Sequence, residues 1–175
     1  NSFANSTTAG NEVTNATVTK NVINNISNTG TNSSAGIMVA SATSGTNTLA
    51  NNMIGGVTAN GTVSDFCTGI LLGGGAGSTT NVYYNTVATN GTITGSTAGV
   101  TQSFALAVTN TTPPTLDIRN NILINTQLPN AGGTTKFYAI GLAYTSTTGN
   151  YAGLTSNNND LFAITGANYA LGITG

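Results

Sequence analysis

Short apolar segments return along the chain in a fixed order, and each surrounds an asparagine. Residues 18–23 read VTKNVI, residues 49–54 LANNMI, residues 82–87 VYYNTV and residues 118–123 IRNNIL. A fifth copy at residues 156–161, SNNNDL, has serine in the first position and keeps the asparagine and the final apolar residue. The aligned asparagines lie 31, 33, 36 and 38 residues apart. They are Asn21, Asn52, Asn85, Asn121 and Asn159.

A second marker, a small residue followed by Ile or Leu, alternates with the first. Its copies begin at Gly36, Gly69, Ala105, Ala139 and Ala170, with separations of 33, 36, 34 and 31 residues. Two markers that interleave in constant order define an internal repeat of 31 to 38 residues. Periods of this length are typical of solenoids and propellers.

The elements within each repeat have the pattern of short strands. Apolar and small residues alternate in residues 36–39, 69–72, 105–108 and 139–142, and the intervening segments are rich in turn-forming residues. Propeller blades need four hairpin-linked strands, and leucine-rich repeats need a different leucine frame. We therefore predict an all-β chain, one β-helix domain over residues 1–175, with about five coils and three short parallel sheets.

A stack of coils gives the recurring asparagine a structural role. Equivalent positions in neighbouring coils lie about 4.8 Å apart, so amide side chains can donate to and accept from one another along the stack. Asparagine also tolerates the left-handed backbone conformation of a tight bend. The five asparagines are predicted to form a ladder at a corner, with the flanking aliphatic residues filling the core.

Composition removes several classes of function. Charged residues make up 4% of the chain, the formal net charge is -1, and histidine is absent. There is no basic surface for nucleic acid, no metal-binding cluster, no cofactor motif and no apolar run of about 18 residues that could insert into a membrane. Cys67 is alone, which excludes an internal disulfide, and is expected to be a small buried thiol.

The repeats over residues 13–175 resemble right-handed parallel β-helix repeats of the pectate-lyase-like superfamily. In that comparison the small-residue strands resemble the first sheet, the strands before the asparagines the second, and the strands after them the third. Residues 156–162, SNNNDLF, also resemble a pattern in large secreted and surface proteins of bacteria. The resemblance implies an extracellular or cell-surface location.

Enzymes of that superfamily act along the first sheet with clustered Asp and with Arg or Lys as base. The corresponding strands here, at residues 36–41, 69–74, 104–109, 138–143 and 169–174, contain no Asp, Glu, Lys, Arg or His. Asp117 and Arg119 are two apart on one strand, which predicts a surface ion pair. Asp160 is expected in a different sheet, so paired acid and base carboxylates are not predicted. We expect no catalytic residues.

If Ile37, Ile70, Leu106, Ile140 and Leu171 point inward, the outward side of the first sheet is small and apolar. Such a face normally signals a cover, either the chain's own loops at 58–66 and 90–103 or another protein chain. The predicted interaction face consists of Gly36, Met38, Gly69, Leu71, Ala105, Ala107, Ala139 and Gly141, continued by Ala170 and Gly172.

The predicted function is a non-catalytic structural or adhesive module that acts as a rigid scaffold. The chain starts without Met and ends within a first-sheet strand, so we expect part of a longer polypeptide or a unit that stacks end to end.

Two alternatives stay open. One is a carbohydrate-binding or polysaccharide-lyase-like module with sugar rings on Tyr83, Tyr84, Tyr138, Tyr144 and Tyr151. The other is ice binding by outward columns of the second sheet. These columns are Thr17, Thr48, Asn81, Asp117, Thr155 and Thr19, Ala50, Tyr83, Arg119, Asn157.

Overall fold

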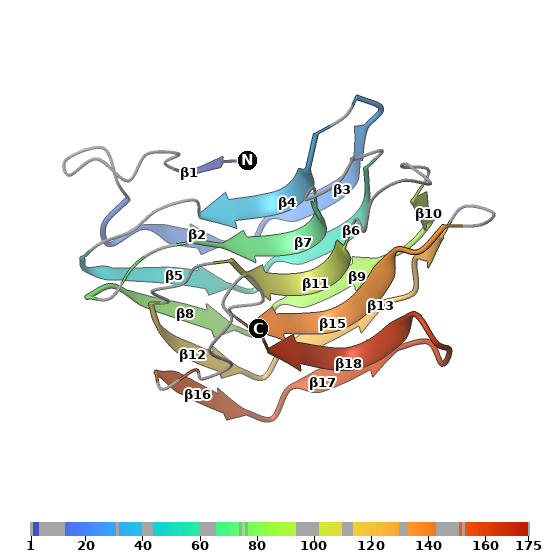
Figure 1. The fold of residues 1–175 in the computed structure, drawn as a ribbon. Helices are drawn as coiled ribbons and strands as arrows, with labels where there is room; N and C mark the ends of the chain where they lie inside the picture. Colours follow the sequence, from blue (N-terminus) through green and yellow to red (C-terminus); the bar gives the residue numbers. More distant parts are fainter. Residues whose placement is uncertain are drawn as a thin grey trace.

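The chain folds as an all-β solenoid of stacked parallel strands, which confirms the predicted fold class (Figure 1). The computed structural model describes residues 2–3, 13–30, 32–39, 44–59, 66–73, 75, 77–93, 102–109, 114–129, 133–142, 151 and 153–174. Two of the sheets hold five strands each, one strand per rung. Five rungs make four steps, so the solenoid has about four turns and not the five expected.

Three parallel sheets surround the core. Sheet A contains β1 (Ser2–Phe3), β4 (Ser34–Val39), β7 (Phe66–Leu72), β11 (Gln102–Val108), β15 (Lys136–Leu142) and β18 (Tyr169–Thr174). Sheet B contains β2 (Thr17–Thr19), β5 (Thr46–Ala50), β8 (Thr79–Tyr83), β12 (Thr115–Arg119) and β16 (Leu154–Asn157). Sheet C contains β3 (Val22–Asn28), β6 (Met53–Ala59), β9 (Thr86–Thr89), β13 (Ile122–Asn125) and β17 (Asp160–Ala163). A short pair, β10 (Thr92–Ile93) and β14 (Leu128–Pro129), follows sheet C in two rungs.

The strand register places the first sequence marker in columns, as the repeat predicts. Val18 pairs with Leu49, which pairs with Val82, and the column continues through Ile118 to Ser156. The second marker is aligned in four copies and shifted by one residue in the fifth, because Ile140 pairs with Gly172 and not with Leu171. The ring of Tyr169 stacks on the ring of Phe137, with the ring centroids 4.9 Å apart, and this contact fits the shifted register. In this register Leu171 is 54% exposed.

The core is made by one aliphatic column from each sheet. Buried members are Ile37, Ile70 and Leu106 from sheet A, Leu49, Val82 and Ile118 from sheet B, and Ile54, Val87 and Leu123 from sheet C. Full burial of such a side chain contributes about 1.5–3 kcal/mol, so these columns supply much of the driving force for folding.

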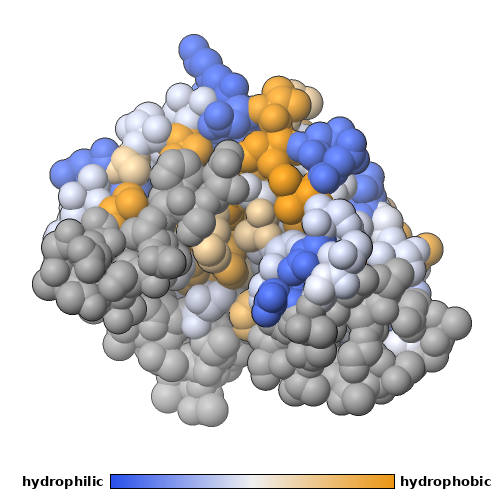
Figure 2. Space-filling view, turned by 90° about the horizontal axis from the view of Figure 1, so that it is seen from above, coloured by the Kyte–Doolittle hydropathy of each residue, from blue (hydrophilic) through white to orange (hydrophobic). Residues whose placement is uncertain are grey.

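The end rungs are less completely buried than the middle ones. Ile23 and Leu161 belong to the same column as Ile54, Val87 and Leu123, yet both are only partly buried. Figure 2 looks down on the end of the stack that holds β2, β3 and β4, and it shows apolar residues in and around a hollow there. The described residues include no helix that is long and apolar enough to span a membrane.

Candidate functional site

The corner between sheets B and C contains an asparagine ladder, as predicted. The side-chain Nδ2 of Asn21 donates to Oδ1 of Asn52 at 2.9 Å, and the same bond links Asn52 to Asn85 at 2.9 Å. Asn85 donates in turn to Asn121 at 3.0 Å and Asn121 to Asn159 at 2.9 Å. One amide per rung therefore connects all five rungs.

The ladder leaves no amide group of its buried members without a partner. Oδ1 of Asn85 accepts from both the backbone N–H and the Nδ2 of Asn52, and its own Nδ2 also donates to the carbonyl of Leu49 at 2.9 Å. In the last rung, Nδ2 of Asn159 donates to Oγ of Ser156 at 3.0 Å. This bond explains why the fifth copy carries serine where the others are apolar. A fully paired polar column adds stability and fixes the strand register.

The left-handed backbone conformation falls one residue before each ladder asparagine. The five residues at this position have φ between 53° and 58°, whereas none of the ladder asparagines has positive φ. The expectation that the ladder asparagine itself adopts this conformation is therefore wrong. The preceding residue makes the bend, which frees the ladder side chain to point into the corner. These bend residues are Lys20, Asn51, Tyr84, Asn120 and Asn158.

The outward face of sheet B has both columns that the sequence predicts. Thr17, Thr48, Asn81, Asp117 and Thr155 lie in register, and so do Thr19, Ala50, Tyr83, Arg119 and Asn157. A third row, Thr46, Thr79 and Thr115, was not predicted, although the Thr-x-Thr spacing at residues 46–48 could have indicated it. The two predicted columns carry no threonine in the middle rungs, whereas the third row runs through them. Ice binding stays a prediction that thermal hysteresis would test.

Tyr83, Asp117 and Arg119 come together in the middle rungs, where the two predicted columns carry no threonine. The hydroxyl of Tyr83 donates to Oδ2 of Asp117 at 2.7 Å, and Nε of Arg119 donates to Oδ1 of the same carboxylate at 2.5 Å. The predicted ion pair is thus confirmed, with Tyr83 as an unexpected third member. Burial raises the pKa of Tyr83, and the bond to Asp117 raises that pKa further. The hydroxyl therefore stays a donor at neutral pH.

The tyrosines proposed for sugar contacts do not form one surface. Tyr84 adjoins Tyr83 at the corner and is 59% exposed. Tyr138 is on sheet A, where its ring stacks on Phe104 at 5.3 Å. Tyr151 donates its hydroxyl to the carbonyl of Pro114 at 2.8 Å, and burial raises its pKa well above the usual range. Tyr144 lies outside the described residues. Of the proposed tyrosines that the structure describes, Tyr83 and Tyr84 alone are brought together.

Half of the interaction face predicted on sheet A points into the core. A Cβ on Gly69 would come 2.1 Å from Cγ1 of Val87, and one on Gly36 would come 2.5 Å from Cγ2 of Ile54, both of which are core residues. Ala105 is itself part of the core, and Ala139, one rung further in the same column, is 0% exposed. The strand alternation is interrupted between the small residue and the following aliphatic, so both face inward. A small residue is needed at this position because a larger side chain would collide with the neighbouring core residues.

The outward column of sheet A consists of Met38, Leu71, Ala107 and Gly141, which are in register. Ala107 is 0% exposed, and a Cβ on Gly141 would lie 2.4 Å from the ring of Phe104. Gly172, expected on this face, is in the inward column of Ile140. The loops expected to cover the face lie mostly outside the described residues. The described part of the face is thus narrower than expected and only partly exposed.

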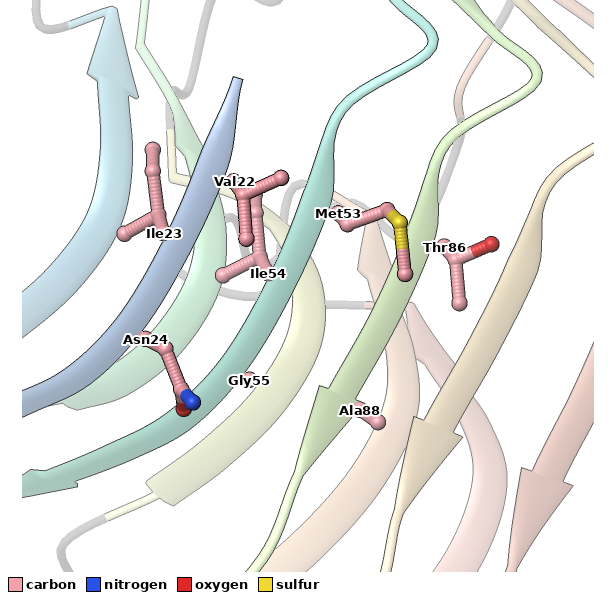
Figure 3. A pocket seen from close by; sticks show the side chains of 8 residues that line it. All are labelled: Val22, Ile23, Asn24, Met53, Ile54, Gly55, Thr86 and Ala88. Atoms are coloured by element: carbon pink, nitrogen blue, oxygen red, sulfur yellow. The ribbon is translucent and has the colours of Figure 1, made fainter. Parts of the chain in front are cut away.

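An apolar strip on sheet C was missed by the sequence analysis. Val22 is 77% exposed, Met53 58% and Ile122 40%, and with Thr86 they form one outward column. Figure 3 shows Val22, Met53 and Thr86 in a row beside Asn24, Gly55 and Ala88, and together they line a shallow groove of about 220 Å³. The period of two in a strand could have revealed the strip. The side chain directly after each ladder asparagine points outward, because the next side chain along the strand points into the core.

A buried polar cluster at the corner between sheets C and A was also missed. Nε2 of Gln127 donates to the carbonyls of Val57 at 2.6 Å and Asn90 at 3.2 Å, and its Oε1 accepts from the hydroxyl of Ser103. Nδ2 of Asn125 donates to Oγ of Ser103 at 2.9 Å. These residues come from three successive rungs and no repeat marks them in the sequence.

Cys67 is the buried thiol that the sequence predicts, and it belongs to this cluster. Its Sγ donates to the carbonyl of Val57 at 3.1 Å, and Nε2 of Gln127 lies 3.5 Å from the sulfur. Burial raises the pKa of the thiol to about 12, against the smaller opposing effect of the Gln127 bond. A thiol that remains protonated is a poor nucleophile and a poor metal ligand.

Ionisable side chains are sparse on the described part of the molecule. Asp117 and Asp160 lie in different sheets, as predicted, and Glu12 and Asp65 are outside the described residues. Among the described residues, no group of three His, Cys, Asp or Glu could hold a metal ion. Comparison of the chain with protein-family models, with curated proteins and with solved structures finds no match.

Proposed function

We propose that the chain is a rigid, non-catalytic β-helical segment, a scaffold, stalk or adhesive module, of a secreted or cell-surface bacterial protein. The observation that carries the proposal is the asparagine ladder, which connects the five rungs through one side-chain amide each, the three inner ones being buried. The resemblance of the repeats to the pectate-lyase-like superfamily supports the secreted setting.

The rigidity has a physical origin in the way that rungs are joined. Each inner rung is bonded to both neighbours through three parallel sheets, and the ladder asparagines add three hydrogen bonds at each step of the corner. Separating two rungs exposes all of these groups at once, so local opening within the stack is costly. A stiff structure of this kind can hold other segments of a protein apart.

The composition suits an extracellular scaffold. Three Lys or Arg residues in 175 leave few sites for trypsin-like proteases. Of the described charges, Asp117 and Arg119 neutralise one another. The first sheet, on which pectate-lyase-like enzymes act, has Lys136 at the start of β15 and no carboxylate in its described strands.

Native-state hydrogen exchange tests the rigidity. The backbone amides of Asn52, Asn85 and Asn121 donate to the next ladder oxygen at 3.0, 2.9 and 3.0 Å. We expect these amides to exchange only through global unfolding, at the same free energy as the core strands. Exchange of the ladder amides by independent opening of single rungs would contradict the scaffold role. Release of unsaturated sugars from uronic acid polymers, abolished by Asp117→Asn, would contradict the non-catalytic role.

A further inference from the structure

We propose that Tyr83, Tyr84, Asp117 and Arg119 form a binding patch for a neutral saccharide, on the outer side of sheet B and the adjoining corner. We call these four residues the saccharide patch. The inference does not depend on the scaffold role, because it rests on a surface cluster and not on the ladder.

The register and one carboxylate hold the patch in place. Tyr83 pairs directly with Arg119 across β8 and β12, and Asp117 bonds to both of their side chains. The ring of Tyr83 and the long side chain of Arg119 are therefore oriented before any ligand arrives. Preorganisation of this kind lowers the entropy cost of binding. Asn157 continues the same column into the next rung, so a ligand can extend along it.

The backbone at Tyr84 is the second observation that points to a ligand. Tyr84 has φ 55°, a left-handed conformation that is uncommon for a bulky side chain. The equivalent positions in three other rungs are the more tolerant Asn51, Asn120 and Asn158. An aromatic ring that is 59% exposed gains little from burial here, so the fold would be better served by asparagine. Strained residues of this kind concentrate at binding sites.

The balance of charge and shape favours a neutral sugar. Asp117 and Arg119 form a pair without net charge, so the patch offers no excess of positive charge for phosphate or nucleic acid. Each carboxylate oxygen keeps a further acceptor site, and a guanidinium has five donors, of which the pair uses the one on Nε. Aromatic rings provide apolar faces beside these polar groups. Sugar rings combine apolar C–H faces with hydroxyls that both donate and accept, which matches this set.

The test is a titration of the whole ¹⁵N-labelled chain followed by NMR. The probes are cellohexaose, xylohexaose, mannohexaose and chitohexaose, with hexagalacturonate as the charged comparison. We expect at least one neutral hexasaccharide to give saturable shifts centred on the amides of residues 83, 84, 117 and 119, with a dissociation constant of about 1 mM. The amide of Asn21, two rungs away from the patch, should not move.

The decisive variant is Tyr84→Asn, which places the residue of three other corners at the same backbone position. We expect it to fold normally and to weaken binding about tenfold, the loss of roughly 1.4 kcal/mol that removal of an aromatic contact gives. Lys20→Asn is the matched control, because it also introduces asparagine at a bend residue, but at a corner two rungs away. It should leave binding unchanged.

Three results would overturn the inference. They are the absence of saturable shifts with all four neutral probes, binding that Tyr84→Asn leaves intact, and binding of hexagalacturonate alone with an affinity that falls as salt rises. Hydrogen exchange of the sugar-free protein is unaffected by any of these results, so failure of the patch and failure of the scaffold role can be distinguished.

Discussion

Two corners of the same solenoid solve one problem, the pairing of buried polar groups, in opposite ways. Between sheets B and C, five identical asparagines repeat the same bonds from rung to rung. Between sheets C and A, four different residues, Cys67, Ser103, Asn125 and Gln127, share one network that occurs once. The first corner is a periodic structure and the second is a local one.

The difference lies in how many neighbours each amide depends on. A ladder asparagine such as Asn85 bonds to the rung before and to the rung after, so four groups in those two rungs each lose a bond when its amide is removed. In the local cluster the partners overlap. The carbonyl of Val57 accepts from both Gln127 and Cys67, and Ser103 bonds to both Gln127 and Asn125. The comparison therefore predicts that the ladder is more sensitive to substitution than the cluster.

Asn85→Leu should give the largest effect. It leaves the backbone N–H and Nδ2 of Asn52, the carbonyl of Leu49 and Oδ1 of Asn121 each without one bond. Nδ2 of Asn52 keeps the carbonyl of Val18, and Oδ1 of Asn121 keeps the backbone N–H of residue 85, so the backbone N–H of Asn52 and the carbonyl of Leu49 are the groups most affected. At about 1–3 kcal/mol for each buried group that loses its partner, the loss is roughly 4 kcal/mol, a large part of the stability of many domains. Urea unfolding followed by circular dichroism measures it.

Asn159→Leu is the matched control at the end of the ladder. Asn159 is only partly buried, and no further ladder asparagine follows it among the described residues. Water can reach the groups that it leaves, so we expect a loss of about 1–2 kcal/mol. Equal effects at both positions would show that the ladder is not cooperative and would remove the main support for the scaffold role.

Gln127→Met should cost less than Asn85→Leu although Gln127 is 0% exposed. The carbonyl of Asn90 loses its bond from the side chain, whereas Val57 and Ser103 each keep one partner. We expect a loss of about 2–3 kcal/mol in the same unfolding measurement.

A double variant tests the sharing in that cluster. Ser103→Ala should cost less in the Gln127→Met background than alone, because its bond to Gln127 is already lost. Strict additivity of the two losses would mean that the cluster is not a network, and the contrast with the ladder would fail.

The same contrast explains what could be predicted from the sequence. The ladder was visible because a repeated structure leaves a repeated residue, and the register of Asn21 through Asn159 follows directly from the spacing. Gln127 has no counterpart in the repeated pattern, and a glutamine of this kind in a polar chain carries no sign that it will be buried.

The errors on the surface have a different cause. Strict alternation placed Gly36 and Gly69 outside, but the strands of sheet A are irregular at these positions, and only packing against Ile54 and Val87 shows that both face inward. Tyr83, Asp117 and Arg119 could be placed in their columns from the spacing, yet the bond between Tyr83 and Asp117 depends on side-chain conformation. Backbone periodicity was thus predictable, and local exceptions to it were not.

Cys67→Ser should alter the pH dependence more than the stability at neutral pH. The pKa of the thiol is about 12 in the folded chain against 9.0 for an unperturbed thiol. Because the folded value is the higher one, the contribution is complete below pH 9 and is lost as the pH rises toward 12. Between pH 8 and pH 11 the natural chain should therefore lose about 3 kcal/mol more than the serine variant.

Serine is a suitable replacement because Ser34 and Ser103 occupy the same column in the adjacent rungs. Urea unfolding of both proteins at pH 8 and pH 11, with a reductant present, measures the difference. Raised tyrosine pKa values affect both proteins equally. Identical pH dependence in the two would show that the thiol is exposed to water and that the cluster is open.

Lys20→Asn should give the smallest change, and it is a gain. Lys20 has φ 58° at the bend before the ladder, where three other rungs carry asparagine. Asparagine adopts this conformation at less cost than lysine, so the variant should be more stable by about 0.5–1 kcal/mol. Lys20→Gln, which keeps a polar side chain without that tolerance, should give no gain. If both variants behave alike, then the bend before the ladder does not select its residue through the backbone, and the tyrosine at position 84 loses its significance as a strained exception.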